Sequence, residues 1–193
     1  MSYGVMAFAA DLEWFRGILG CGDRAIVDSD LASWADQLDE IDRSLGLTPE
    51  AGCRLAYERM IMGGEQVGHP ATYGYCFELF CMRLATYLPN DHWSGMDSRW
   101  FGAVRDALRE GGVPDFDPAS LIRNGPGVPL PRIADFPRIG HVPRERVPAL
   151  RRELDGLNPD AVADPDALEA IRQMRDWLWA CEEGGRSLIC FYH

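Results

Sequence analysis

The two ends of the chain carry the patterns of β-strands. Residues 3–8 alternate aromatic and branched side chains with small ones, which is typical of a strand. Residues 187–192 form a second segment that is strongly apolar. Because strands this apolar are usually covered on both faces, we expect the two to neighbour each other at the centre of a small sheet.

Apolar residues at helical spacing account for most of the chain between these strands. The predicted helices cover residues 12–19, 31–45, 49–62, 73–88, 100–110, 148–154 and 165–183, and Asp28, Ser29 and Asp30 are expected to cap the second of them. The helix over 73–88 is apolar around most of its circumference, which indicates a buried central helix. The predicted fold class is α+β, with residues 1–193 as a single helix-rich domain.

The segment from 114 to 148 differs from the rest in composition. It holds eight of the thirteen prolines, and proline removes backbone donors and fixes φ, so regular structure here must be short. Apolar residues scattered along the segment predict that it packs on the body of the domain and wraps one face. Long irregular segments of this kind are usually functional or act as linkers.

Charge narrows the function classes. The chain has 30 acidic residues against 19 basic ones, all arginine, and a formal net charge of −11. This balance argues against a nucleic-acid-binding protein, whose affinity comes from neutralising phosphates. No apolar run reaches the roughly 18 residues that span a bilayer, and residues 3–10 lack the cationic flank of a signal peptide. We therefore expect a cytoplasmic protein without a membrane partner.

Motifs with known chemistry are missing from the sequence. The six cysteines form no C-x-x-C pair and lie among apolar residues, which is typical of reduced cytosolic thiols. The four histidines lack metal-ligand spacing, and no dinucleotide, phosphate-loop or nucleophile-elbow motif is present. We expect no metal and no cofactor, and the chain carries no signature that makes it an enzyme.

The most unusual stretch runs from Gly68 to Glu78. Glu78 lies within the apolar central helix, where a carboxylate must find a partner or shift its pKa upward. Tyr75 shares its helix face, and Tyr73 and His69 are near enough in sequence to converge on the same place. One hypothesis is an acid/base or ligand-binding site of these four side chains. The other is structural: an arginine neutralises Glu78, and the pair holds the Pro-rich segment in register.

A second candidate is the outer face of the predicted helix over 31–45. It carries Asp36, Asp39, Glu40 and Asp42, opposite an apolar face. One interpretation is a surface that docks a basic partner or mimics nucleic acid, and the other is an ordinary solvated face. The net charge favours basic partners over acidic ones.

Three groups of residues carry a resemblance to a known family. They are Tyr73-Gly74-Tyr75 with Glu78 and Cys81, Leu88-Pro89-Asn90 followed by Arg99-Trp100, and Pro129-Leu130-Pro131 followed by Asp135-Phe136-Pro137 and Gly140. Together with the two terminal strands, they resemble an uncharacterised family of actinobacterial proteins of about this length, known as a domain of unknown function. The ends are distantly similar to a second uncharacterised bacterial family of small α/β proteins. Neither resemblance implies an activity, so no catalytic residue is transferred. The absence of lysine fits a GC-rich genome.

Three functional hypotheses follow from these observations. The first is an interaction module, such as the immunity partner of a basic toxin, that uses the acidic helix face. The second is a small-molecule-binding protein or enzyme with a pocket around Glu78, Tyr75 and the Pro-rich segment. The third is a structural subunit of a homo-oligomer, for which six tryptophans leave room for an apolar interface. The sequence does not distinguish among oligomeric states.

Overall fold

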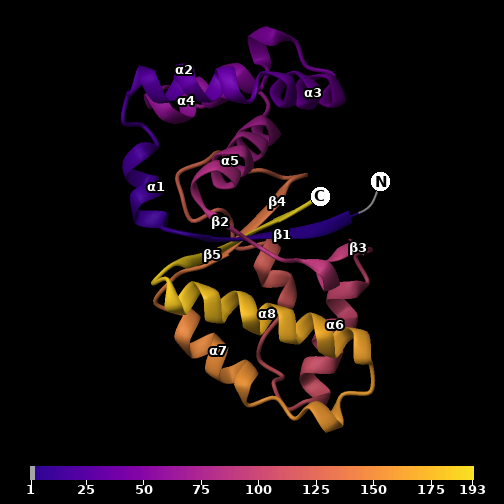
Figure 1. Ribbon diagram of the computed structural model, residues 1–193. Coiled ribbons are helices and arrows are strands. Elements are labelled where there is room, and N and C mark those ends of the chain that lie inside the picture. Colours follow the sequence, from indigo (N-terminus) through magenta and orange to yellow (C-terminus); the bar gives the residue numbers. More distant parts are fainter. Residues whose placement is uncertain (1–2) are drawn as a thin grey trace.

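Both predicted terminal strands lie at the centre of one antiparallel sheet (Figure 1). The computed structural model describes residues 3–193, apart from the side chain of Pro49. The strands are β1 (Tyr3–Ala10), β2 (Thr86–Leu88), β3 (Ser94–Met96), β4 (Arg138–Val142) and β5 (Ser187–Tyr192). Their order is β2-β1-β5-β4, and β3 pairs with the first residues of β1. The predicted α+β fold class, with both chain ends in the sheet, is confirmed.

Helices cover both faces of this sheet (Figure 1). On one side, α5 (Pro70–Leu84) lies against the strands, and α2 (Arg24–Ser33), α3 (Ala35–Leu45) and α4 (Cys53–Met62) are stacked beyond it (Figure 1). Together with α1 (Leu12–Ile18), these helices form what we call the upper layer. The other face is covered by α6 (Trp100–Glu110), α7 (Val147–Asp155) and α8 (Pro165–Glu183), the lower layer. Short 3-10 turns are η1 (Pro49–Ala51), η2 (Asp91–Trp93), η3 (Pro118–Ile122) and η4 (Pro159–Ala161).

The alternation of a strand divides the central side chains between the two layers. Val5, Ala7 and Cys190 belong to the core under the lower layer, whereas Phe8 and Phe191 belong to the core under the upper layer. Ala7 and Cys190 are also paired in register across β1 and β5. Because these paired side chains are small, the lower core has room for large rings.

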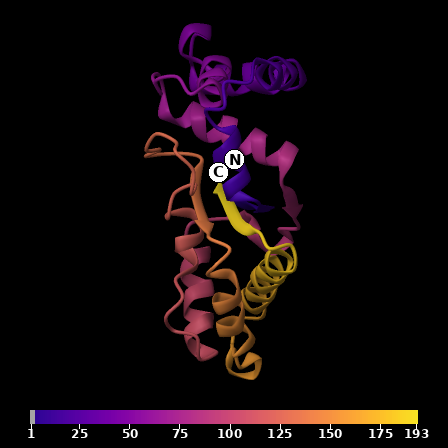
Figure 2. The same ribbon diagram turned by 90° about the vertical axis from the view of Figure 1, so that its left-hand side faces the viewer.

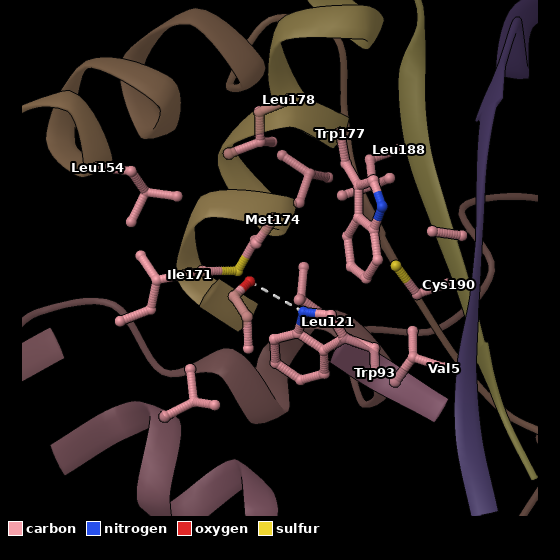
Figure 3. Packing of buried hydrophobic residues seen from close by; sticks show 14 of the residues in the cluster. Val5, Trp93, Leu121, Leu154, Ile171, Met174, Trp177, Leu178, Leu188 and Cys190 are labelled. Atoms are coloured by element: carbon pink, nitrogen blue, oxygen red, sulfur yellow. Dashed lines mark hydrogen bonds between the residues drawn. The ribbon is translucent and has the colours of Figure 1, made fainter. Parts of the chain in front are cut away.

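Two tryptophans fill that room (Figure 3). Trp93 and Trp177 are both buried, with ring centroids 5.8 Å apart. Trp93 Nε1 donates to Ala170 O at 3.0 Å, and Trp177 Nε1 donates to Pro89 O at 2.6 Å. Each indole thereby satisfies its one donor while burying its apolar ring. The lower core therefore contains polar atoms without containing a buried charge.

The acidic segment predicted as one helix over 31–45 folds as two. Helices α2 and α3 are separated by a turn at Trp34, so the predicted single helix is wrong. The expected cap at 28–30 is also wrong, because these residues lie inside α2, and Asp23 is its N-cap. An acid before an apolar run is typical of a cap, and the sequence held no sign that one of these acids turns inward.

That inward acid is Asp30. It is buried, accepts a hydrogen bond from Tyr57 Oη and forms an ion pair with Arg83 of α5. A buried carboxylate needs such partners to offset the loss of hydration. The three side chains tie α2, α4 and α5 together.

The central helix begins at Pro70, earlier than predicted, and also ends earlier. Helix α5 ends at Leu84, and Thr86–Leu88 forms β2 against Ala7–Ala9 of β1 instead of continuing the helix to 88. A short apolar run is compatible with a helix or a strand. Residues 86–88 form a strand because they pair with the edge of β1. The helix expected over 49–62 likewise begins with the separate 3-10 turn η1, and α4 starts at Cys53.

The Pro-rich segment 114–148 contains η3 and β4 and contacts the upper layer. Arg16 of α1 donates from its Nη2 to Gly127 O at 2.6 Å. On α5, a Cβ added to Gly74 would lie 2.9 Å from the Ile133 side chain. The missing side chain at Gly74 therefore lets the segment lie directly on the central helix.

Candidate functional site

Helix α5 brings two of the predicted site residues to the end of β5. Glu78 is buried, and its Oε1 lies 2.8 Å from Nε2 of His193, which follows β5. The rings of Tyr75 and His193 are stacked, with centroids 5.6 Å apart and planes at 26°. The carboxylate orients the imidazole and the phenol ring packs against it. The partner of Glu78 is thus a histidine and not the arginine of the structural hypothesis.

This cluster lies in an open groove of about 580 Å³ between α3 and α5. The residues that line the groove are Met6, Asp36, Gln37, Glu40, Ile41, Tyr75, Glu78, Leu79, Met82 and His193. Two regions that the sequence treated as separate candidates, the central helix and the acidic helix, therefore share one groove.

The groove is negatively charged with an apolar floor. Asp36, Glu40 and Glu78 supply the charge, and no arginine is among the lining residues. Glu40 also pairs with Arg43 one turn along α3, but both side chains are 69% exposed, so solvent screens the pair. The apolar floor is formed by Met6, Ile41, Leu79 and Met82.

The other two acids of the predicted stripe have partners elsewhere. Asp39 forms an ion pair with Arg54 at 3.1 Å. Asp42 Oδ1 accepts a hydrogen bond from Cys53 N at 2.7 Å, at the first residue of α4. Two of the four predicted acids therefore stabilise the packing of α3 on α4, and the other two line the groove.

His69 and Tyr73 do not join the groove. His69 is the N-cap of α5, and its Nδ1 accepts from Ala71 N at 3.3 Å. Tyr73 is buried, and its hydroxyl donates to Val67 O at 3.0 Å. Both residues fix the chain where it enters the helix. The four-residue acid/base hypothesis is thereby reduced to its two later members.

Tyr75 is influenced by a charge of the Pro-rich segment as well as by the groove. Burial, and then the negative charges of Glu78 and Asp135, raise the pKa of Tyr75 above its ordinary value. The phenol therefore stays protonated and able to donate at neutral pH. Asp135 belongs to the Pro-rich segment but does not line the groove. The pocket expected between this segment and Glu78 is thus not one cavity.

His193 was missed as a site residue, although a signal for it exists. Strand alternation from Ile189 and Phe191, both in the upper core, places position 193 on the same face of the sheet. That face is covered by α5. The alternation, applied one residue beyond the strand, would have directed the imidazole toward the central helix.

Comparison with known proteins adds a family without an activity. A family model described as Domain of unknown function (DUF7691) matches residues 1–193. The chain belongs to this family. No curated protein and no solved structure matches the chain. The function of this DUF7691 protein must therefore be argued from its own groove.

Two further findings on this DUF7691 chain concern metal sites and membrane-spanning helices. Within residues 3–193, no group of three or more His, Cys, Asp and Glu side chains is arranged to hold a metal ion. In the same part of the chain, each helix is either too short or too polar to cross a bilayer.

Proposed function

We propose that this protein is a bacterial, cytosolic binding protein whose groove takes a basic, partly apolar segment of a partner protein. The observation that carries the proposal is the groove itself, which Asp36, Glu40 and Glu78 line together with four apolar side chains. An arginine or lysine side chain has the matching form, since a cationic head ends an apolar stem.

Two properties of the molecule support a basic partner. The net charge of −11 attracts cationic proteins and speeds their encounter. Met82, which is 47% exposed, adds a flexible apolar side chain to the groove, and methionine adapts to partners of varied shape. An immunity protein that neutralises a basic toxin is one class of protein with these requirements.

The direct test uses a fluorescently labelled synthetic peptide of alternating arginine and leucine. We expect it to bind the full chain, with an affinity that falls about tenfold in the double variant Asp36→Asn/Glu40→Gln. Fluorescence anisotropy at constant ionic strength measures both values.

The matched control is the double variant Asp115→Asn/Glu153→Gln. These two acids are exposed, form no ion pair within the described residues and lie outside the groove. The control removes the same net charge, so it separates the groove from general attraction. Equal losses in the two double variants would show that the peptide binds only to the overall charge, and the proposal would fail.

A second candidate function rests on the hydrogen bond between Glu78 and His193. A carboxylate that orients an imidazole beside an open groove has the geometry of a general base. The corresponding test is hydrolysis of p-nitrophenyl acetate, which an acid/base enzyme would accelerate and which His193→Phe would abolish. The same variant retains an aromatic ring against Tyr75, and in a binding protein it leaves the affinity for the basic peptide nearly unchanged.

A further inference from the structure

A second depression lies outside the groove, along the outer edge of β4. It has a volume of about 410 Å³ and is enclosed by β4 and by the chain between η3 and β4, which is drawn in orange tones at one edge of the molecule in Figure 2. Its lining includes Arg123, Arg132 and Arg138, together with Ile122, Ile133 and Ile139. We call this depression the arginine pocket.

The three arginines differ from most others in the chain. Within residues 3–193, eleven of the 19 arginines form ion pairs with Asp or Glu, and four more donate hydrogen bonds to other groups. The remaining four are Arg123, Arg132, Arg138 and Arg146, and the first three line the same pocket. These three arginines are exposed, line one pocket and form no ion pair with an acid of the described residues.

No acid lines the arginine pocket to compensate these charges. This absence is unexpected in a chain with 30 acidic residues and a net charge of −11. Like charges gathered at one site repel each other unless an anion joins them. A bound anion would therefore be favoured here although the protein as a whole is acidic.

Backbone contacts hold the walls of the pocket in place. Gly125 N donates to Ile139 O at 3.0 Å, which ties the loop to the outer edge of β4. Gly140 carries no Cβ, and this lets η3 approach the β4 backbone closely. The Arg138 guanidinium lies 5.7 Å from the ring centre of Phe136, a contact that orients it. A site formed in advance loses little entropy when a ligand binds.

We infer that the arginine pocket binds a small organic phosphomonoester. A phosphomonoester brings a charge of about −1.5 to −2 and three strong acceptor oxygens at neutral pH, which match the fork geometry of arginine. Ile122 and Ile139 are buried in the core, so the partly buried Ile133 provides the apolar surface for the organic part of the ligand. Nucleic acid is disfavoured because its extended phosphate chain would be repelled by the net charge of −11. This site is separate from the proposed function of the groove.

Isothermal titration calorimetry with three probes on the full chain tests the inference. The probes are phenyl phosphate, inorganic phosphate and phenol, used at one ionic strength. We expect phenyl phosphate to bind more tightly than inorganic phosphate, and phenol to show no binding. Arg132→Gln and Arg138→Gln should each weaken the binding of phenyl phosphate by roughly tenfold, because each removes one charge-assisted contact.

Arg146→Gln is the matched control, since Arg146 also lacks a partner but lies outside the pocket. It should leave the affinity unchanged, and circular dichroism should show the native spectrum for every variant. The inference is overturned if phenyl phosphate gives no binding at millimolar concentration. It is also overturned if the control weakens binding as much as the pocket variants, because the anion would then respond only to overall charge.

Discussion

The two helical layers cover the same sheet but differ in what they bury. In the lower layer, the core is closed around Trp93 and Trp177, whose indole donors bond to backbone carbonyls. In the upper layer, the buried carboxylates Asp30 and Glu78 pair with Arg83 and His193. Among the described residues, both buried acids lie on this one side of the sheet. Both layers bury an apolar core, and among the described residues the upper layer alone also holds buried acids in position.

This division has a physical cause. Apolar burial has no directional requirement. A core without charges therefore needs only to be filled and to have its buried hydrogen-bond donors paired. A buried charge is costly unless it is paired, and its pairing is specific to one arrangement. The groove borders the layer that contains such pairs. The following four predictions test this contrast, beginning with the largest expected effect.

Truncating a lower-layer tryptophan should cause the largest loss. Trp93→Ala should lower the free energy of unfolding by about 3–5 kcal/mol, because it opens a cavity and removes the hydrogen bond to Ala170 O. Trp179→Ala, on α8 but with a side chain 57% exposed, should change it by less than about 0.5 kcal/mol. Urea denaturation followed by far-UV circular dichroism measures both. Similar losses would show that burial of the Trp93 ring does not stabilise the lower core.

Breaking the buried ion pair of the upper layer should have the next effect. Arg83→Met should cost about 2 kcal/mol, because it leaves Asp30 with Tyr57 alone. The loss is smaller than for a fully buried pair, since the Arg83 side chain is 38% exposed. Arg24→Met breaks a solvent-exposed pair and should cost no more than about 0.5 kcal/mol. Equal unfolding midpoints in urea for the two variants would show that burial of Asp30 does not matter.

Alkaline pH should lower the free energy of unfolding, because buried thiols ionise less readily than the same thiols in the unfolded chain. Burial raises the pKa of Cys181 from its ordinary 9.0 to about 12. The folded state therefore keeps a proton that the unfolded chain releases, so this contribution is complete below pH 9 and is lost as the pH rises toward 12. Between pH 8 and pH 10, Cys181→Ala should reduce the fall in unfolding free energy by about 1 kcal/mol.

Urea titrations at the two pH values measure that fall. Cys21 is exposed, so Cys21→Ala should leave it as in the wild type. The part that remains in Cys181→Ala comes from other buried groups, because burial also raises the pKa of Cys81 and Cys190. A fall that is identical in all three proteins would contradict the assignment to Cys181.

The groove acids should matter least for stability. Asp36→Asn/Glu40→Gln should change the unfolding free energy by less than about 0.5 kcal/mol, because both acids are exposed and the pair of Glu40 with Arg43 is screened. The same urea experiment gives this value beside the peptide affinity. A large destabilisation would show that these acids stabilise the fold, and it would contradict the contrast between the layers.

The ends of helix α8 are predicted by residues that lie close to them in the sequence. The pair Asp164-Pro165 predicts its first turn, and the structure has Asp164 as N-cap with its Oδ1 accepting from Asp166 N and Ala167 N. The helix ends at Glu183, as predicted, and Gly184 follows it. Caps, proline at the first turn and a terminating glycine act within a few residues, so the sequence states them directly.

The groove, in contrast, is not predicted by residues that are close in the sequence. Its acids at positions 36 and 40, its carboxylate at 78 and its imidazole at 193 come from three separate parts of the chain. The sequence marked Glu78 as unusual because it interrupts an apolar helix, but nothing local distinguished a histidine partner from an arginine. The partner of Glu78 is set by the sheet, because the chain that follows β5 places His193 against α5.

The sequence by itself determined the α+β class, the central pairing of the two terminal strands and the acidic character of the surface. These properties follow from periodicity, apolar content and charge, which are additive along the chain. Only the tertiary structure decided that α3 and α5 share a groove, that Asp30 turns inward and that three arginines meet beside β4. Such encounters depend on packing between distant segments, where the strand face and helix orientation select each partner.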